Sequence, residues 1–241
     1  MSLYDQVKQR DREIAREHAG RDAYFSLSPT RVSLTRVLLP AARQVLRGRI
    51  LDAGAGMTAY APALKESVED YVAVDIQSNP RLDAVGSVMQ LPLRDEAFDG
   101  VFCSQVLEHV DDPQAALHEF FRCMKPGGAL ALSVPHLAYL HNEPHDYFRY
   151  TKHGLRVLLE RAGFVEITIQ PAGGLLSFLG HIPSVIAKSV AKPVPGLNWT
   201  VYAFNAWYSR AISYIDAYLE PRKLFALNYV AVARKPGAPH D

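Results

Sequence analysis

Short apolar runs alternate with longer amphipathic stretches through the middle of this chain. The apolar runs lie at residues 49–53, 71–76, 98–104 and 129–134, and each precedes a polar or glycine-rich turn and a stretch with helical periodicity. Strands that alternate with helices form right-handed crossovers and build a mostly parallel sheet with helices on both faces. Strand-like alternation returns at residues 165–170 and 227–233. The pattern therefore predicts an α/β fold.

Helices are expected before and after this alternating section. Residues 4–18 are strongly charged, and residues 29–46 carry apolar positions at helical spacing, with Ser28 in the place of an N-cap. Residues 167–187 and 193–209 contain no Lys, Arg, Asp or Glu, but glycine, proline and asparagine interrupt them. We therefore expect amphipathic or buried helices there and not transmembrane helices.

These patterns suggest N-terminal helices at residues 1–47 and a domain at 48–241 that carries an apolar helical insert at 173–219. The balance of 26 basic and 25 acidic residues, with 49% hydrophobic residues, excludes wholesale disorder and disfavours a strongly basic nucleic-acid binder. Two cysteines make neither a disulfide framework nor a zinc site. The first twenty residues contain no apolar run, so we expect a cytoplasmic protein.

A glycine loop follows the first expected strand. Gly54 and Gly56 allow backbone to approach a ligand closely, and Asp75 ends the next strand. A carboxylate in that place can accept hydrogen bonds from both ribose hydroxyls of a nucleoside. Alternatively, Asp75 is a solvated carboxylate in a turn. The glycine loop beside Asp75 makes this alternative less favoured.

The identity of the nucleoside depends on Asp52. The spacing Gly54-x-Gly56-x-x-Ala59, with an acid about twenty residues later, also satisfies the dinucleotide fingerprint. However, a carboxylate at Asp52 would repel a pyrophosphate, whereas it suits the ammonium group of a ligand that carries an amino acid. The sequence also lacks a Tyr-x-x-x-Lys pair after the fifth strand for hydride chemistry. NAD is therefore the less favoured ligand.

Six motifs in order resemble those of one enzyme family. They are LDAGAG at 51–56, VD at 74–75, LPL at 91–93, FDGV at 98–101, LEHV at 107–110 and MKPGG at 124–128. Together they are similar to class I S-adenosylmethionine-dependent methyltransferases of the type-11 group, over residues 48–170. The resemblance implies a Rossmann-like three-layer sandwich with a seven-stranded sheet in the order 3-2-1-4-5-7-6. Strand 7, at residues 227–233, would be antiparallel.

The resemblance also implies S-adenosylmethionine as the cofactor and assigns its contacts. Asp52 would face the methionine end, Gly54 and Gly56 would line the pocket, Asp75 would hold the ribose, and Ile76 would pack on the adenine. The remaining expected contacts are backbone or side chains around the adenine edge and the methionine portion: Ser87, Val88, Met89, Ser104 and Gln105. Two positions depart from the family pattern, because Thr58 replaces a common third glycine and Ser87 replaces a common aspartate.

The acceptor is expected at the loop after residues 129–134. Residues 135–151 hold three histidines, two acids and four aromatic residues, and a neighbouring His145–Asp146 pair could act as general base, with His136 as a further catalytic candidate. The histidine spacing is poorly diagnostic of a metal site, and we expect none. Phe148 and Thr151 are better explained as core and helix cap. Glu108 and His109 could form an acid–base pair, but a pocket-wall role is favoured.

The leading hypothesis is an enzyme that methylates an oxygen or nitrogen of a small or carrier-linked acceptor. Residues 104–107 read SQVL where DNA amino-methyltransferases usually show a Pro-Pro-aromatic motif, so no nucleic-acid substrate is expected. A non-catalytic cofactor-binding or accessory protein is the alternative, and an NAD-dependent oxidoreductase comes third. The insert at 173–219 is expected to cover the acceptor site and to reach a membrane surface or a second copy of the chain.

Overall fold

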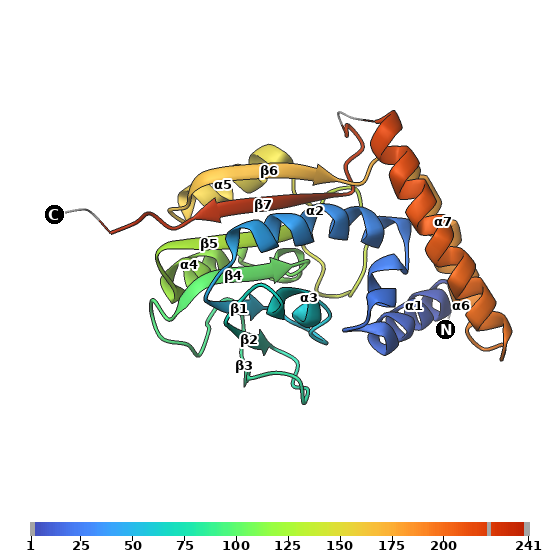
Figure 1. Ribbon diagram of the computed structural model, residues 1–241, viewed down its shortest axis with the longest axis horizontal. Helices are drawn as coiled ribbons and strands as arrows, with labels where there is room; N and C mark the ends of the chain where they lie inside the picture. Colours follow the sequence, from blue (N-terminus) through green and yellow to red (C-terminus); the bar gives the residue numbers. More distant parts are fainter. Residues whose placement is uncertain (1–2, 221–222, 239–241) are drawn as a thin grey trace. The chain divides into compact units, whose positions relative to one another are not determined.

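The computed structural model describes residues 3–220 and 223–238 and divides into two compact units. The sheet unit comprises Val37–Pro171 and Asn228–Asp241, and the helical unit comprises Met1–Arg36 and Ala172–Leu227. Helix α2 contains one boundary between them. Figure 1 shows the strands and helices of both units.

The sheet unit has the predicted topology. Its seven strands follow the order β3-β2-β1-β4-β5-β7-β6. The β1–β2, β2–β3, β1–β4 and β4–β5 pairs are parallel, whereas β7 runs antiparallel to β5 (Figure 1). The strands are β1 Arg49–Ala53, β2 Asp70–Asp75, β3 Ala84–Val85, β4 Phe98–Ser104, β5 Met124–Pro135, β6 Val165–Ala172 and β7 Asn228–Arg234. The Rossmann-like fold class and the strand order are therefore confirmed.

Continuous apolar runs form the central strands because both faces of the sheet are covered. Burial is complete from residue 50 to residue 53 in β1 and from residue 128 to residue 135 in β5, as expected for parallel strands between two helical layers. The other elements of this unit are α2 Pro29–Val45, α3 Ala61–Lys65, η2 Leu107–His109, α4 Pro113–Cys123 and α5 Lys152–Arg161. Predicted caps are present, since Ser28 Oγ accepts Arg31 N–H (3.3 Å) and Thr151 Oγ1 accepts Gly154 N–H (3.0 Å).

The sequence predicts a helix that begins near Thr58 or Ala59 and a turn at residues 126–128 before the next strand, and the structure differs from both predictions. The helix after the glycine loop begins at Ala61 and not near residue 58, because Thr58 has φ +53° and so interrupts a helix. The turn expected at residues 126–128 lies within β5, where Gly127 has φ +77° and the pairing with β4 shifts register.

The helical unit joins the N-terminal residues to the insert, which the sequence pattern had placed in separate parts. Its elements are α1 Leu3–His18, η1 Asp22–Ser26, α6 Leu175–Ala191 and α7 Leu197–Leu219, with the first turns of α2. Helix α6 contacts both α1 and α7. Within the described residues, no helix combines the length and the apolar character required to cross a bilayer.

Candidate active site

The glycine loop begins where β1 ends and is anchored to β2. The backbone N–H groups of Gly54 and Ala55 both donate to the carbonyl of Val74, at 2.8 and 3.0 Å. Gly54 has φ +78°, and a Cβ atom there would lie 2.4 Å from Val106 Cγ2. Gly56 also has positive φ (+51°), but a Cβ there would meet no heavy atom within 4 Å. Gly54 is therefore required for packing, whereas Gly56 borders open space.

Asp75 is held at the end of β2 by backbone donors. Its Oδ2 accepts the N–H of Gly56 at 2.8 Å, and its Oδ1 accepts the N–H of Gln77 at 2.8 Å. Each carboxylate oxygen can accept a second hydrogen bond, so both remain able to receive a ribose hydroxyl. The neighbouring Ile76 side chain is 69% exposed, as a residue that packs on an adenine ring requires. Together with the space at Gly56, this arrangement fits a nucleoside.

Asp52 is a buried carboxyl group in β1, two residues before Gly54. It accepts a hydrogen bond from the Tyr71 hydroxyl and is almost fully buried. Burial raises the pKa of Asp52 to about 7; the Tyr71 hydrogen bond opposes this shift, and the nearby negative charge of Asp75 adds to it. The group therefore changes charge near neutral pH, in the place expected for the cationic end of the cofactor.

Asp52→Asn is expected to stabilise the ligand-free protein by about 2 kcal/mol more at pH 8 than at pH 5. The unfolded chain releases the Asp52 proton near its ordinary value of 3.8, whereas the folded protein holds it until about pH 7. Stability from this group is therefore lost as pH rises between these values, and asparagine avoids the loss. Urea denaturation of both proteins at the two pH values measures the difference, and an equal effect at both would contradict this origin.

The side chains of the loop after β3 pack inward or fix its turn. The Val88 side chain belongs to the hydrophobic core, and Met89 packs against that core. Ser87 Oγ accepts the N–H of Met89 at 3.2 Å, which fixes the turn. A hydroxyl is a weaker acceptor than the aspartate common in the family. The adenine contacts expected of Ser87, Val88 and Met89 stay predictions.

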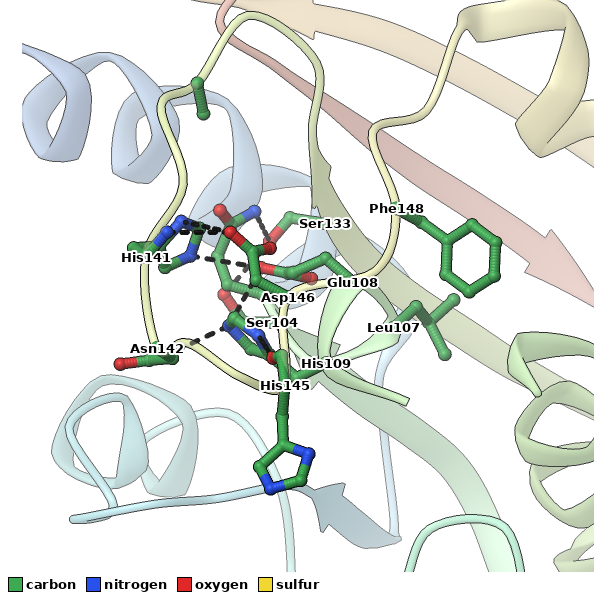
Figure 2. Close-up of polar contacts among 12 residues, drawn as sticks. Ser104, Leu107, Glu108, His109, Ser133, His141, Asn142, His145, Asp146 and Phe148 are labelled. Atoms are coloured by element: carbon green, nitrogen blue, oxygen red, sulfur yellow. Dashed lines mark hydrogen bonds and ion pairs between the residues drawn. The ribbon is translucent and has the colours of Figure 1, made fainter. Parts of the chain in front are cut away.

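Polar side chains gather where β4 and β5 end. Ser104 Oγ lies 3.0 Å from Ser133 Oγ, and Gln105 Nε2 donates to Ser133 Oγ at 3.2 Å (Figure 2). Gln105 has φ +58° and ends the strand sharply. Because the carboxyl ends of parallel strands form the ligand-binding edge of such sheets, Ser104 and Gln105 lie where the methionine portion is expected.

The loop after β5 is fixed by Asp146. Its carboxylate accepts two hydrogen bonds from Arg149, both 2.7 Å. It also accepts the backbone N–H of His141 at 2.7 Å, a contact that Figure 2 shows. Burial alone would raise the pKa of Asp146, but these hydrogen bonds outweigh it and lower the pKa to about 2. Asp146 is therefore an anion at neutral pH that holds the loop in place.

The structure does not bring His145 and Asp146 together as a pair. His145 Nδ1 lies 2.9 Å from the Tyr147 hydroxyl, and in Figure 2 its exposed ring points away from Asp146. Asp146 instead lies near His141, with 3.6 Å between Oδ2 and Nδ1. The third candidate, His136, stacks obliquely beside Tyr229, with ring centroids 5.2 Å apart.

The side chains that follow His145 split between surface and core. Phe148 is 37% exposed, so it is not the core residue that was expected. Tyr150 is buried instead, and its hydroxyl donates to the Leu107 carbonyl at 2.7 Å.

Glu108, for which the sequence favoured a pocket-wall role, lies beside two histidines in the structure. It is fully buried in η2, and within the described part of the chain neither carboxylate oxygen has a hydrogen-bond partner. Its Oε1 lies 3.7 Å from His109 Nε2 and 3.9 Å from His141 Nε2 (Figure 2). Burial raises the pKa of Glu108 to about 8, so a neutral carboxyl group faces two imidazole rings at pH 7.

This cluster could exchange a proton with an acceptor, and its three ligand atoms, all within 4.8 Å of one another, could also hold a metal ion. The adjacent Glu108 and His109 are visible in the sequence, but His141 joins them only through folding. Two backbone contacts bring its loop to η2: Tyr147 N–H donates to the Glu108 carbonyl (2.8 Å), and His109 Nδ1 lies 2.7 Å from the His145 carbonyl.

Comparisons with known proteins agree with this geometry. Residues 51–132 match the family model described as a methyltransferase domain. A demethylmenaquinone methyltransferase of Renibacterium salmoninarum is 29% identical over 54% of this chain and 58% of its own length. A ubiquinone biosynthesis O-methyltransferase of Xanthomonas campestris is 31% identical over 45% of this chain and 50% of its own length. The chain thus spans about half the length of the curated relatives it matches.

Among solved structures, the [4+2]-cyclase SpnF superposes with a TM-score of 0.58 and 21% identity over 84% of this chain and 81% of its own. This likeness concerns the fold. The matched domain, the strand order and the pairing of a glycine loop with Asp75 lead to one family. Residues 51–132 therefore form a methyltransferase domain, in a sheet with the strand order of class I S-adenosylmethionine-dependent methyltransferases.

Proposed function

We propose that the protein transfers the methyl group of S-adenosylmethionine to an oxygen or nitrogen atom of a small or carrier-linked acceptor. The observation that carries the proposal is the Asp75 carboxylate, which Gly56 and Gln77 hold beside the open space at Gly56. In this reaction the sulfur–methyl bond breaks as the acceptor–methyl bond forms, S-adenosylhomocysteine leaves, and the acceptor loses its proton. The protein must mainly align the two reactants and receive that proton.

A small acceptor is favoured over a nucleic acid. Two relatives are named as a demethylmenaquinone methyltransferase and as an O-methyltransferase of ubiquinone biosynthesis. Both names support a small-molecule acceptor, and the second supports an oxygen atom as the methylated position. The polar groups at the ends of β4 and β5, with Glu108 beside them in η2, supply hydrogen-bonding groups for such an acceptor.

Calorimetric titration followed by a turnover assay tests the proposal. S-adenosylmethionine should bind, NAD should not, and S-adenosylhomocysteine should appear only with an acceptor whose mass rises by one methylene group. Binding of NAD in place of S-adenosylmethionine would contradict the proposal. A panel of phenols, catechols, amines and carrier-linked sugars provides the first acceptors to compare.

His145 is proposed to act on the acceptor side, in the loop that Asp146 fixes and His136 begins. His145→Ala should therefore lower turnover by about 100-fold or more, because a general base contributes at least that much, while cofactor affinity stays unchanged. His153→Ala, at an exposed position of α5, is the matched control. Steady-state kinetics on a verified acceptor measure the effect, and an unchanged rate would assign His145 a structural role.

A cofactor-binding protein without methyl transfer is the second candidate. The observation that favours it is the similarity of the fold to a structure named as a [4+2]-cyclase. One fold supports unrelated chemistries, so the fold alone does not determine the reaction. This candidate predicts tight binding of the cofactor with no release of S-adenosylhomocysteine for any acceptor, which the same assay distinguishes.

A further inference from the structure

The helices α6 and α7 have polar residues on the faces that they bury. In α6 the buried positions include Ser177, Gly180, Ser184, Lys188 and Ser189, and in α7 they are Asn205, Ser209, Ser213 and Asp216. These positions recur every three or four residues, so they form one stripe along each helix. A helix that packs onto a soluble core usually buries an apolar stripe and exposes a polar one. Both helices therefore have an inverted pattern.

Hydrogen bonds and an ion pair hold this polar interior together. Asp216 of α7 accepts the Ser177 hydroxyl (2.8 Å) and the Leu176 N–H (3.0 Å), both at the start of α6. Lys188 is buried and pairs with Asp11 of α1 at 2.8 Å. Gly180 lets α6 approach α7 closely, because a Cβ there would lie 2.8 Å from the hydroxyl oxygen of Tyr208. Polar contacts and close approach therefore join the helices, and α6 adds only two buried apolar side chains, Val185 and Ala191.

The outward faces of the same helices are mainly apolar, and Arg210 is the charged residue that α7 exposes. Exposed residues of α6 follow one helical stripe: Leu175, Leu179, Ile182, Ile186 and Val190. Exposed residues of α7 include Leu197, Trp199, Phe204, Trp207, Tyr214, Ile215, Tyr218 and Leu219. Trp199 is 76% exposed and Tyr218 is 86% exposed. Residues 167–187 and 193–209 carry no Lys, Arg, Asp or Glu. Water is a poor solvent for such faces.

We infer that the outward faces of α6 and α7 insert into the interfacial region of a lipid bilayer. Small and polar residues between helices, with apolar residues outside, are typical of helices that pack in lipid, where no hydrophobic force joins them. Tryptophan and tyrosine rings suit the headgroup boundary because they combine apolar and polar parts. A second copy of the chain could cover an apolar face, but a dimer in water gives no reason for a polar interior. The inference does not depend on methyl transfer.

The two tryptophans of the chain, Trp199 and Trp207, are both on the exposed part of α7 and make this region observable without a label. Full-length protein is mixed with phosphatidylcholine vesicles, with or without phosphatidylglycerol, and flotation and tryptophan emission are recorded. Binding to lipid should move the protein with the vesicles and shift the emission to shorter wavelength. Lipids brominated on their acyl chains should quench it.

Leu179→Glu combined with Ile182→Glu places two charges on the exposed stripe of α6 and should reduce vesicle partitioning by roughly tenfold or more. Val157→Glu, at an exposed apolar position of α5, is the matched control and should bind as the wild type does. Circular dichroism verifies that each variant is folded, and Phe204→Glu on α7 repeats the test if the double variant is not.

Sedimentation velocity without lipid tests whether a second copy of the chain covers these faces instead of a bilayer. A folded wild-type protein that ignores both kinds of vesicle would overturn the inference, and a dimer dissociated by the same glutamates would assign the faces to a second copy. Vesicle binding that these glutamates leave unchanged would equally overturn it. Partitioning that requires phosphatidylglycerol would show that headgroup charge contributes, and it would still support insertion.

Discussion

Asp75→Ala is expected to weaken S-adenosylmethionine binding by about 100-fold or more. Two ribose hydroxyls donating to a carboxylate make charge-assisted hydrogen bonds worth roughly 1.5–3 kcal/mol each, and 1.4 kcal/mol is about tenfold in affinity. The structure adds a second cause, because Asp75 also accepts the N–H groups of Gly56 and Gln77. Its removal therefore also loosens the loop that borders the ligand.

Calorimetry measures this loss, and thermal unfolding of the ligand-free variant verifies that the sheet remains intact. Asp75→Asn separates the two causes, since its amide oxygen can keep one backbone hydrogen bond but carries no charge. We expect an affinity between those of wild type and Asp75→Ala. A well-folded alanine variant with wild-type affinity would remove Asp75 from the cofactor site.

Features that short stretches of sequence encode could be predicted. Six strands of the sheet, the glycine loop and the caps at Ser28 and Thr151 each depend on residues within a few positions of one another, whereas the two-residue strand β3 (Ala84–Val85) was not predicted. The geometry at Asp75 was predictable for the same reason, since a strand end next to a glycine loop is a local arrangement repeated in parallel sheets. The strand order came with the family resemblance, which several such motifs together identify.

Side-chain direction could not be predicted in the acceptor loop. The sequence suggested that His145 and Asp146 act together because they are neighbours, but Asp146 is oriented by Arg149 and the backbone of His141. Neighbours in an irregular loop have no fixed relation between their side chains, unlike neighbours in a strand. Glu108 and His141 are brought together only by contacts between η2 and the loop after β5.

For the insert at residues 173–219, the helices could be predicted from the sequence, but the residues that they bury could not. Its uncharged stretches are visible in the sequence and correctly predicted helices, but the pattern also contains serines, asparagines and glycines that weaken any apolar stripe. Only the structure places Ser177, Ser213 and Asp216 inside and Leu179 and Trp207 outside. Hydrophobic periodicity assumes an apolar interior, so it does not anticipate a polar one.

Gly54→Ala and Gly56→Ala are expected to act on different properties of the same loop. Both positions have positive φ, where an added Cβ costs about 1–2 kcal/mol. At Gly54 the new methyl group would also lie 2.4 Å from Val106 Cγ2, an overlap that adds roughly 1–3 kcal/mol. Gly54→Ala should therefore lower the free energy of unfolding by about 2–5 kcal/mol. Gly56→Ala should lower it by only about 1–2 kcal/mol, because its methyl group would enter open space.

Cofactor affinity should be lower in Gly56→Ala, although that variant loses less stability than Gly54→Ala. The methyl group at residue 56 occupies space that we assign to the nucleoside, so the folded Gly56→Ala protein should bind S-adenosylmethionine at least roughly tenfold more weakly. Val106→Ala provides the control for Gly54→Ala, since it removes the overlapping methyl groups but leaves the backbone strain. In a double-mutant cycle, it should restore only the packing part of the lost stability. Urea denaturation and calorimetry measure both quantities, and a Gly56→Ala variant with wild-type affinity would show that the cofactor approaches from elsewhere.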